Sequence, residues 1–145
     1  SFEPCGYSMN AILYDSYTTI HVTPETHCSY ASFETNISYG SYQSVISNVL
    51  DVFRPKRFVL TMFADENSLR SLKENPFCES SYRVIQIPRL GSYMVDNISS
   101  TVVESDMCCY MGNWRLATPD LALKKKRVAH RLREHGRKTR GYSVG

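Results

Sequence analysis

The chain has 145 residues, 42% hydrophobic and 12% aromatic, which is typical of one globular domain with a sizeable core. No run of 18 apolar residues predicts a transmembrane helix, and the N-terminus lacks the basic and apolar regions of a signal peptide. The five cysteines are irregularly spaced and form no C-x-x-C pair, which argues against a disulfide framework or a zinc site. Reduced thiols and a cytoplasmic location are therefore expected.

The net charge of +3 is unevenly distributed along the chain. Residues 1–122 hold 8 Lys and Arg against 13 Asp and Glu, whereas residues 123–145 hold 9 against one. A turn at Thr118-Pro119-Asp120 divides a domain at residues 1–118 from a basic tail at residues 119–145. Such a tail can bind nucleic acid or acidic membranes, but we prefer a solvated segment that is helical or disordered.

The first third of the chain predicts three strands. Residues 6–14 and 17–22 form a hairpin around a tight turn at Asp15 and Ser16. Residues 28–35 predict a third strand, on which alternation places two sets of side chains on opposite faces. One set is Tyr30, Ser32 and Glu34, and the other is Ala31, Phe33 and Thr35.

A helix is predicted next, capped by Ser41, running through Phe53 and ended by Pro55. Five apolar residues at helical spacing form its buried stripe, namely Val45, Ile46, Val49, Leu50 and Phe53. Further on we predict a buried strand at residues 58–63, a short helix at 68–74, and strands at 82–87 and 94–103 that pair with each other. Connections this short favour antiparallel pairing, so the fold class is α+β, an antiparallel β-sheet with helices on one outer face.

Ser8 and His21 lie on adjacent strands of the predicted hairpin, so their side chains can meet across it. A Ser–His pair can move protons during acyl transfer. On spacing alone, however, a structural or solvated pair is the more common outcome, and no G-x-S-x-G motif supports a hydrolase.

Three ordered blocks sharpen this pattern: P-C-G-Y-S-M-N at residues 4–10, I-H-V-T-P-E at 20–25 and S-Y-A-S-F-E-T-N at 29–36. They resemble the C-terminal part of eukaryotic S-adenosylmethionine decarboxylase, the pyruvoyl-dependent family of spermidine and spermine synthesis. The resemblance is strong over residues 2–63, fades through 64–103 and is absent from the tail. It implies an α/β/β/α sandwich, of which this chain supplies part of the second sheet and its outer helix, with an apolar inner face left exposed.

The resemblance implies a self-cleaving proenzyme, in which an internal serine undergoes an N-to-O acyl shift and becomes a pyruvoyl group. That group binds the substrate amine as a Schiff base and accepts electrons during loss of carbon dioxide. Ser8 and His21 match the serine and histidine that assist processing. His21 would take a proton from the oxyoxazolidine intermediate, and Ser8 would hydrogen-bond near the same carbonyl.

Phe2 matches a phenylalanine that stacks on adenine, and Glu25 matches the glutamate that binds the ribose hydroxyls. Glu34 matches a buried acid near the site where some members bind putrescine, their activator. Each has a plainer alternative: Phe2 as core, Glu25 as an exposed turn residue and Glu34 in a structural salt bridge. Cys5 is interpreted as a packing thiol beside the site.

The pyruvoyl-forming serine and the proton-donating cysteine of the family have no matching position here. Glu79-Ser80-Ser81 mimics the cleavage site, but it follows the Ser8 block rather than preceding it, so we interpret it as a coincidence. The chain alone is therefore expected to be inactive.

The partners implied by the resemblance are S-adenosylmethionine, the N-terminal half of the same enzyme and, in some members, putrescine; a homodimer stays open. The alternative function is a non-catalytic regulatory paralogue that binds a nucleoside or the partner enzyme.

Overall fold

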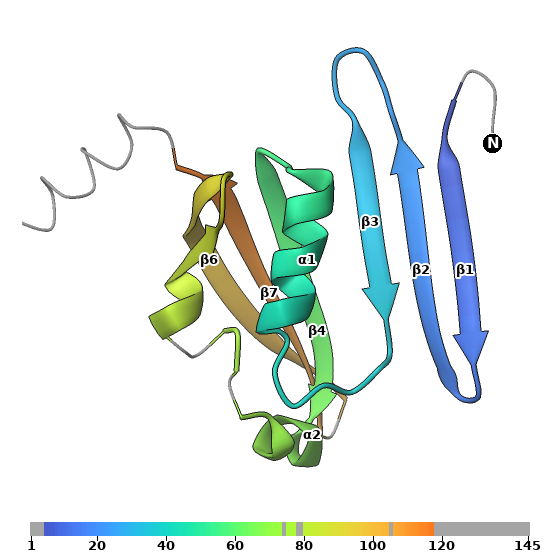
Figure 1. Ribbon diagram of the computed structural model, residues 1–145. Helices are drawn as coiled ribbons and strands as arrows, with labels where there is room; N and C mark the ends of the chain where they lie inside the picture. Colours follow the sequence, from blue (N-terminus) through green and yellow to red (C-terminus); the bar gives the residue numbers. More distant parts are fainter. Residues whose placement is uncertain (1–4, 74, 78–79, 105, 118–145) are drawn as a thin grey trace, which may run out of the picture.

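The computed structural model describes residues 5–73, 75–77, 80–104 and 106–117, which form two antiparallel sheets with two α-helices and one 3₁₀-helix (Figure 1). Phe2, Cys78, Glu79 and the predicted tail at 119–145 lie outside the described residues. The domain boundary at residue 118 therefore stays a prediction, whereas the α+β class with antiparallel pairing is confirmed.

The N-terminal sheet has three strands in the order β1-β2-β3, formed by β1 (Tyr7–Leu13), β2 (Ser16–Thr23) and β3 (Tyr30–Thr35). The predicted hairpin and third strand are confirmed, but the turn lies one residue earlier, because Ser16 already belongs to β2. Tyr14 adopts a left-handed φ of 56°, which closes this tight turn. Asn36 ties it to the end of β3, since its amide accepts from the Tyr17 N–H at 2.7 Å and donates to the Asp15 carbonyl at 2.8 Å.

The cross-strand register gives this sheet one polar and one apolar face. Ser8, His21 and Ser32 lie opposite one another in one row, and the next row along the same face is polar too (Asn10, Thr19 and Glu34). The other face holds two apolar rows, Tyr7, Val22 and Ala31, then Met9, Ile20 and Phe33.

Helix α1 (Gln43–Phe53) follows β3 and buries Ile46 and Leu50 of the predicted stripe. The prediction that Ser41 is the N-cap is wrong, because Tyr42 occupies that position without a side-chain cap. The Ser41 hydroxyl instead accepts from the Gln43 N–H at 3.3 Å, one residue before the cap. Arg54, with a left-handed φ of 47°, ends the helix ahead of Pro55.

The second sheet has four strands in the order β4-β7-β6-β5. They are β4 (Arg57–Asp65), β5 (Val84–Ile87), β6 (Gly91–Glu104) and β7 (Met107–Leu116). The predicted pairing of the last two expected strands is confirmed as β5 with β6. Strand β7 was not predicted, and Gly112 and Asn113 weaken its strand propensity, yet it pairs along both edges with β4 and β6.

Two further elements differ from the sequence prediction. Helix α2 (Glu66–Ser71) starts two residues earlier than expected, because the Asp65 carboxylate caps it by accepting the Ser68 N–H at 2.6 Å. This hydrogen bond lowers the pKa of Asp65. The predicted strand at 82–87 begins as a 3₁₀-helix, η1 (Ser80–Arg83), and only then becomes β5.

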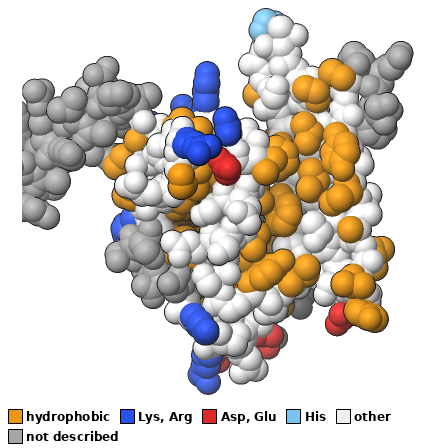
Figure 2. All heavy atoms as spheres, viewed as in Figure 1, with side chains coloured by type: hydrophobic (Ala, Val, Ile, Leu, Met, Phe, Trp, Pro, Cys, Tyr) orange, Lys and Arg blue, Asp and Glu red, His pale blue; other side chains and the backbone are white. Residues whose placement is uncertain are grey.

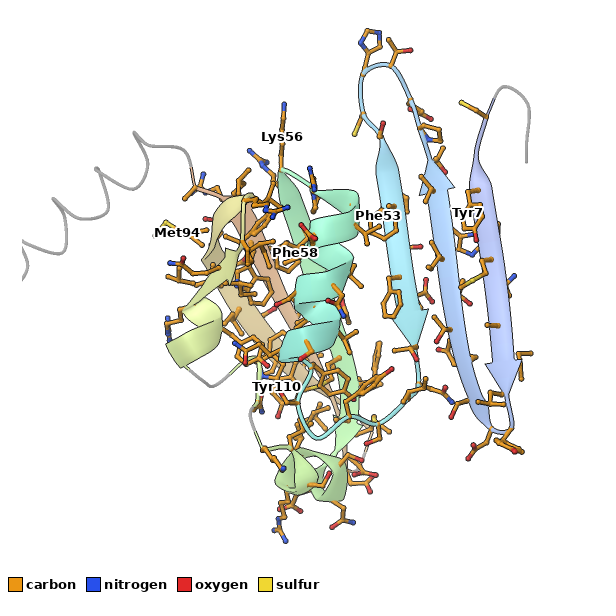
Figure 3. The ribbon with its side chains drawn as sticks, in the orientation of Figure 1. Tyr7, Phe53, Lys56, Phe58, Met94 and Tyr110 are labelled. Atoms are coloured by element: carbon orange, nitrogen blue, oxygen red, sulfur yellow. The ribbon has the colours of Figure 1, made fainter. Side chains whose placement is uncertain are left out.

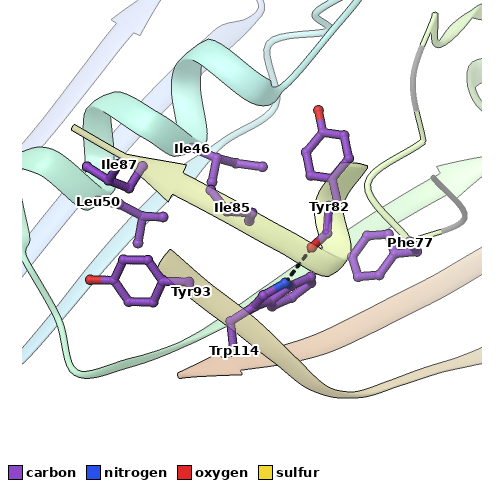
Figure 4. Packing of buried hydrophobic residues seen from close by; sticks show 8 residues of the cluster. All are labelled: Ile46, Leu50, Phe77, Tyr82, Ile85, Ile87, Tyr93 and Trp114. Carbon is purple, nitrogen blue, oxygen red and sulfur yellow. Dashed lines mark hydrogen bonds between the residues drawn. The ribbon is translucent and has the colours of Figure 1, made fainter. Parts of the chain in front are cut away.

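The core lies between α1 and the four-stranded sheet (Figure 4). Its eight buried members are Ile46, Leu50, Phe77, Tyr82, Ile85, Ile87, Tyr93 and Trp114. The Trp114 indole is 1% exposed, stacks on Phe58 at 5.1 Å between ring centroids, and donates through Nε1 to the Tyr82 carbonyl at 2.8 Å. In Figure 3, Phe58 and Tyr110 are among the side chains that pack beside this cluster, while Tyr7 belongs to the other sheet.

The three-stranded sheet contributes no fully buried side chain among the described residues. Hydrophobic side chains gather over β1 to β3 on the side from which α1 is seen (Figure 2), where Tyr7 is 53% and Leu13 69% exposed. On the four-stranded sheet, the face away from α1 exposes Val59, Phe63 and Met111. Both sheets therefore present apolar surface that the described residues leave uncovered, not only the inner face predicted from the sequence.

No helix in the described part of the chain is long and apolar enough to cross a membrane.

Candidate functional site

Ser8 and His21 meet across the β1–β2 hairpin. The Ser8 hydroxyl lies 2.9 Å from Nδ1 of His21, and the two residues are direct partners in the strand register. Both side chains are exposed on the polar face of the three-stranded sheet. The hydrogen-bonded pairing of β1 with β2 thus brings the two predicted side chains together, and no loop residue is needed.

A shallow depression of about 310 Å³ lies over this pair at the open end of the hairpin. Its lining mixes a thiol, a hydroxyl and an imidazole with backbone and apolar atoms (Cys5, Gly6, Tyr7, Ser8, His21, Val22 and Thr23). The Cys5 thiol lies 3.9 Å from the Pro24 carbonyl, at the limit of a weak hydrogen bond. The site is open enough to admit a backbone segment or a small ligand from outside this chain.

Glu25 lies in the turn between β2 and β3, two residues after the end of the strand that carries His21. The Ser29 hydroxyl closes this turn by donating to the Glu25 carbonyl at 3.2 Å and accepting from the Glu25 N–H at 3.3 Å. These bonds fix the backbone of Glu25 while its side chain is exposed. The structure therefore positions this carboxylate at the same end of the sheet as the depression.

Glu34 is exposed on the same face as His21, in the neighbouring row. Of the ion pairs among the described residues, none involves Glu34, so the alternative of a structural salt bridge is not seen. Thr19 is its direct partner and bonds onward to Asn10 at 3.0 Å. Within the described residues, no group of three His, Cys, Asp or Glu side chains could hold a metal ion.

Sequence reasoning missed one member of the site. Ser32 lies directly opposite His21 on β3, as Ser8 does on β1. Alternation placed Ser32 on the face of Glu34, but only the register between β2 and β3 brings it beside the imidazole. Pairing the predicted strands at residues 17–22 and 28–35 residue by residue could have identified Ser32 as the partner of His21. Phe2 cannot be placed, because it lies outside the described residues.

Among solved structures, the fold is similar to that of the Trypanosoma brucei AdoMetDC-delta26 monomer. The two share 34% sequence identity with a TM-score of 0.65, over 81% of this chain and 45% of that chain. The class of protein is therefore an antiparallel α+β domain with a Ser–His pair exposed on the polar face of one sheet.

The family model of adenosylmethionine decarboxylase matches residues 1–111, and the chain belongs to this family. The relatives include the S-adenosylmethionine decarboxylase proenzymes of Xenopus laevis, 54% identical over 68 residues, and Dictyostelium discoideum, 49% identical over 67 residues. Each match covers 46% of this chain, but only 20% of the Xenopus protein and 18% of the Dictyostelium protein. The matched segment of this chain therefore spans about a fifth of the length of these relatives.

Proposed function

We propose that residues 1–118 form the C-terminal part of an S-adenosylmethionine decarboxylase that matures by self-cleavage. The observation that carries this proposal is the 2.9 Å contact between the Ser8 hydroxyl and Nδ1 of His21. Membership of the family and the names of the proenzyme relatives support the same assignment.

In self-cleavage, His21 takes up a proton as an acyl group passes from a backbone nitrogen to a serine oxygen. Imidazole suits this step, because it is the side chain that gains and loses a proton near neutral pH. The Ser8 hydroxyl, 2.9 Å from Nδ1, holds the ring beside the carbonyl region in which the proton is transferred. Since both side chains are exposed, the segment to be cleaved can reach them from outside this chain.

The residues present are compatible with a neighbouring pyruvoyl group, because a hydroxyl and an imidazole face an open depression whose lining is partly apolar. When bound, that group supplies the electron sink for loss of carbon dioxide. No serine of residues 1–145 matches the one that forms it, so we propose that this chain alone does not decarboxylate.

Substrate binding is assigned to Glu25 and Phe2. The Glu25 carboxylate is exposed at the end of β2 and can accept hydrogen bonds from two ribose hydroxyls. Phe2 is assigned to the adenine, whose ring it would contact face to face, and its aromatic face would attract the sulfonium charge. Glu34, exposed and without an ion pair among the described residues, is assigned to a diamine such as putrescine.

A chimeric proenzyme tests this proposal. Residues 1–111 of this chain replace the matching segment of the Xenopus laevis proenzyme, to which 68 of its residues align at 54% identity. We expect the chimera to cleave itself and to release labelled carbon dioxide from S-adenosylmethionine. A chimera that folds but neither cleaves nor decarboxylates would favour the non-catalytic paralogue instead.

A further inference from the structure

Ser32 gives His21 a second hydroxyl neighbour. His21 lies on the central strand β2, with Ser8 opposite it on β1 and Ser32 opposite it on β3. Direct cross-strand partners on one face have Cβ atoms ~4.5–5.5 Å apart. The register therefore places one serine on each side of His21, and Ser32 is the less exposed of the two.

The orientation of the imidazole makes this second neighbour relevant to proton transfer. Nδ1 lies 2.9 Å from the Ser8 hydroxyl, which leaves Nε2, on the opposite edge of the ring, to another partner; Ser32 on β3 is the other cross-strand partner of His21. Nδ1 has a lone pair to accept a proton only in the neutral tautomer that carries its hydrogen on Nε2. Which tautomer forms depends on the hydrogen bond that the other nitrogen makes.

We propose that Ser32 is a positioning residue for His21, whose hydroxyl accepts a hydrogen bond from Nε2–H and so keeps Nδ1 available as the proton acceptor beside Ser8. No direct hydrogen bond joins Ser32 to His21 among the described residues. One bridging water or a small rotation of the imidazole would complete the contact. This inference rests on the proposed function, since it assigns a partner to the base of the same reaction.

The test uses the chimeric proenzyme with three substitutions of Ser32. Ser32→Ala should slow self-cleavage about 3- to 10-fold, the factor that one hydrogen bond commonly contributes. Ser32→Thr and Ser32→Val have nearly the same shape and differ by the hydroxyl, so Thr should cleave near the parent rate and Val should resemble Ala. Ser44→Ala, on the exposed side of α1, is the matched control and should cleave at the parent rate.

Nitrogen-15 NMR of histidine-labelled chimera supplies a readout that a merely structural role would not change. The His21 signal is identified by its loss in His21→Ala. The parent should hold the Nε2–H tautomer, and Ser32→Ala and Ser32→Val should give a mixture of tautomers.

An unchanged tautomer and parent cleavage rates in both variants, with His21→Ala blocked, would overturn the role of Ser32 and leave the proposed function standing. Parent-rate cleavage by His21→Ala would overturn the proposed function itself.

Discussion

Gly112 in the middle of β7 should tolerate no side chain. A Cβ added at this position would overlap Cη2 and Cζ3 of Trp114 and lie 3.3 Å from its Cζ2, inside the ~3.5–4.0 Å at which carbon atoms pack. The indole cannot easily move, because Phe58 stacks on it with 1° between the ring planes and its N–H is bonded to the Tyr82 carbonyl.

The expected cost of Gly112→Ala combines two effects. Overpacking a close-packed core costs about 1–3 kcal/mol, and pulling the indole N–H off a buried carbonyl costs about 1–3 kcal/mol more. A loss of about 2–6 kcal/mol is a large share of the roughly 5–15 kcal/mol that stabilises a folded domain.

Urea unfolding in dilute solution, followed by far-UV circular dichroism and by the fluorescence of the single tryptophan, measures this loss. With a denaturant slope of about 2 kcal/mol/M, the midpoint should fall by about 1–3 M. The matched control is Gly40→Ala, where an added Cβ meets nothing within 4 Å, and its midpoint should barely change. Equal midpoints for Gly112→Ala and the parent would refute the packing of Trp114 against Gly112.

Three further outcomes follow from the fold and the proposed site. Burial raises the pKa of Tyr93. The stability that its phenol contributes is therefore present below about pH 10 and is lost as the pH rises through the pKa of the folded state. An ultraviolet titration should show one tyrosine that ionises at higher pH than the others, and this step should be absent from Tyr93→Phe. That variant also removes the 2.5 Å bond to the Pro55 carbonyl and should cost about 1–2 kcal/mol in urea unfolding, whereas unchanged stability would count against the bond. Because both sheets expose apolar surface, sedimentation should show that the purified chain self-associates as its concentration rises. The double variant Leu13→Ser and Phe63→Ser should associate less. A monomer with a sharp, reversible and concentration-independent thermal transition would contradict this prediction. Purified residues 1–145 should release no labelled carbon dioxide, and release that a carbonyl reagent abolishes would show that a pyruvoyl group can form without a matching serine.

Much of the fold could be predicted where local pattern and tertiary environment agree. The stripe of α1 predicted the helix that buries Ile46 and Leu50, and alternation along β3 predicted its two faces. The start of α2 was predicted two residues too late, because Asp65, the last residue of β4, is also the N-cap of the helix. The N-cap was wrongly assigned to Ser41, because the Ser41 hydroxyl accepts from the Gln43 N–H although the next residue, Tyr42, is the cap.

Strand β7 shows the limit of such reasoning. Its buried Trp114 needs Gly112 beneath the ring, and both residues make sense only once β4 and β6 flank the strand. The site shows the same division: the three sequence blocks singled out Ser8 and His21, whereas Ser32 emerges only from the pairing of β2 with β3. Long-range pairing of this kind leaves no signal within a single stretch of sequence.

Time-resolved gels of the chimeric proenzyme test the central claim most directly, that Ser8 and His21 serve self-cleavage. His21→Ala should block cleavage or slow it greatly, because no other described imidazole lies within hydrogen-bond reach of Ser8. Glu25→Gln, in the exposed turn beside the same depression, should cleave at the parent rate and weaken nucleoside binding instead, since ribose is absent during processing. Cleavage of His21→Ala at the parent rate, with failure of Glu25→Gln to cleave, would contradict the account.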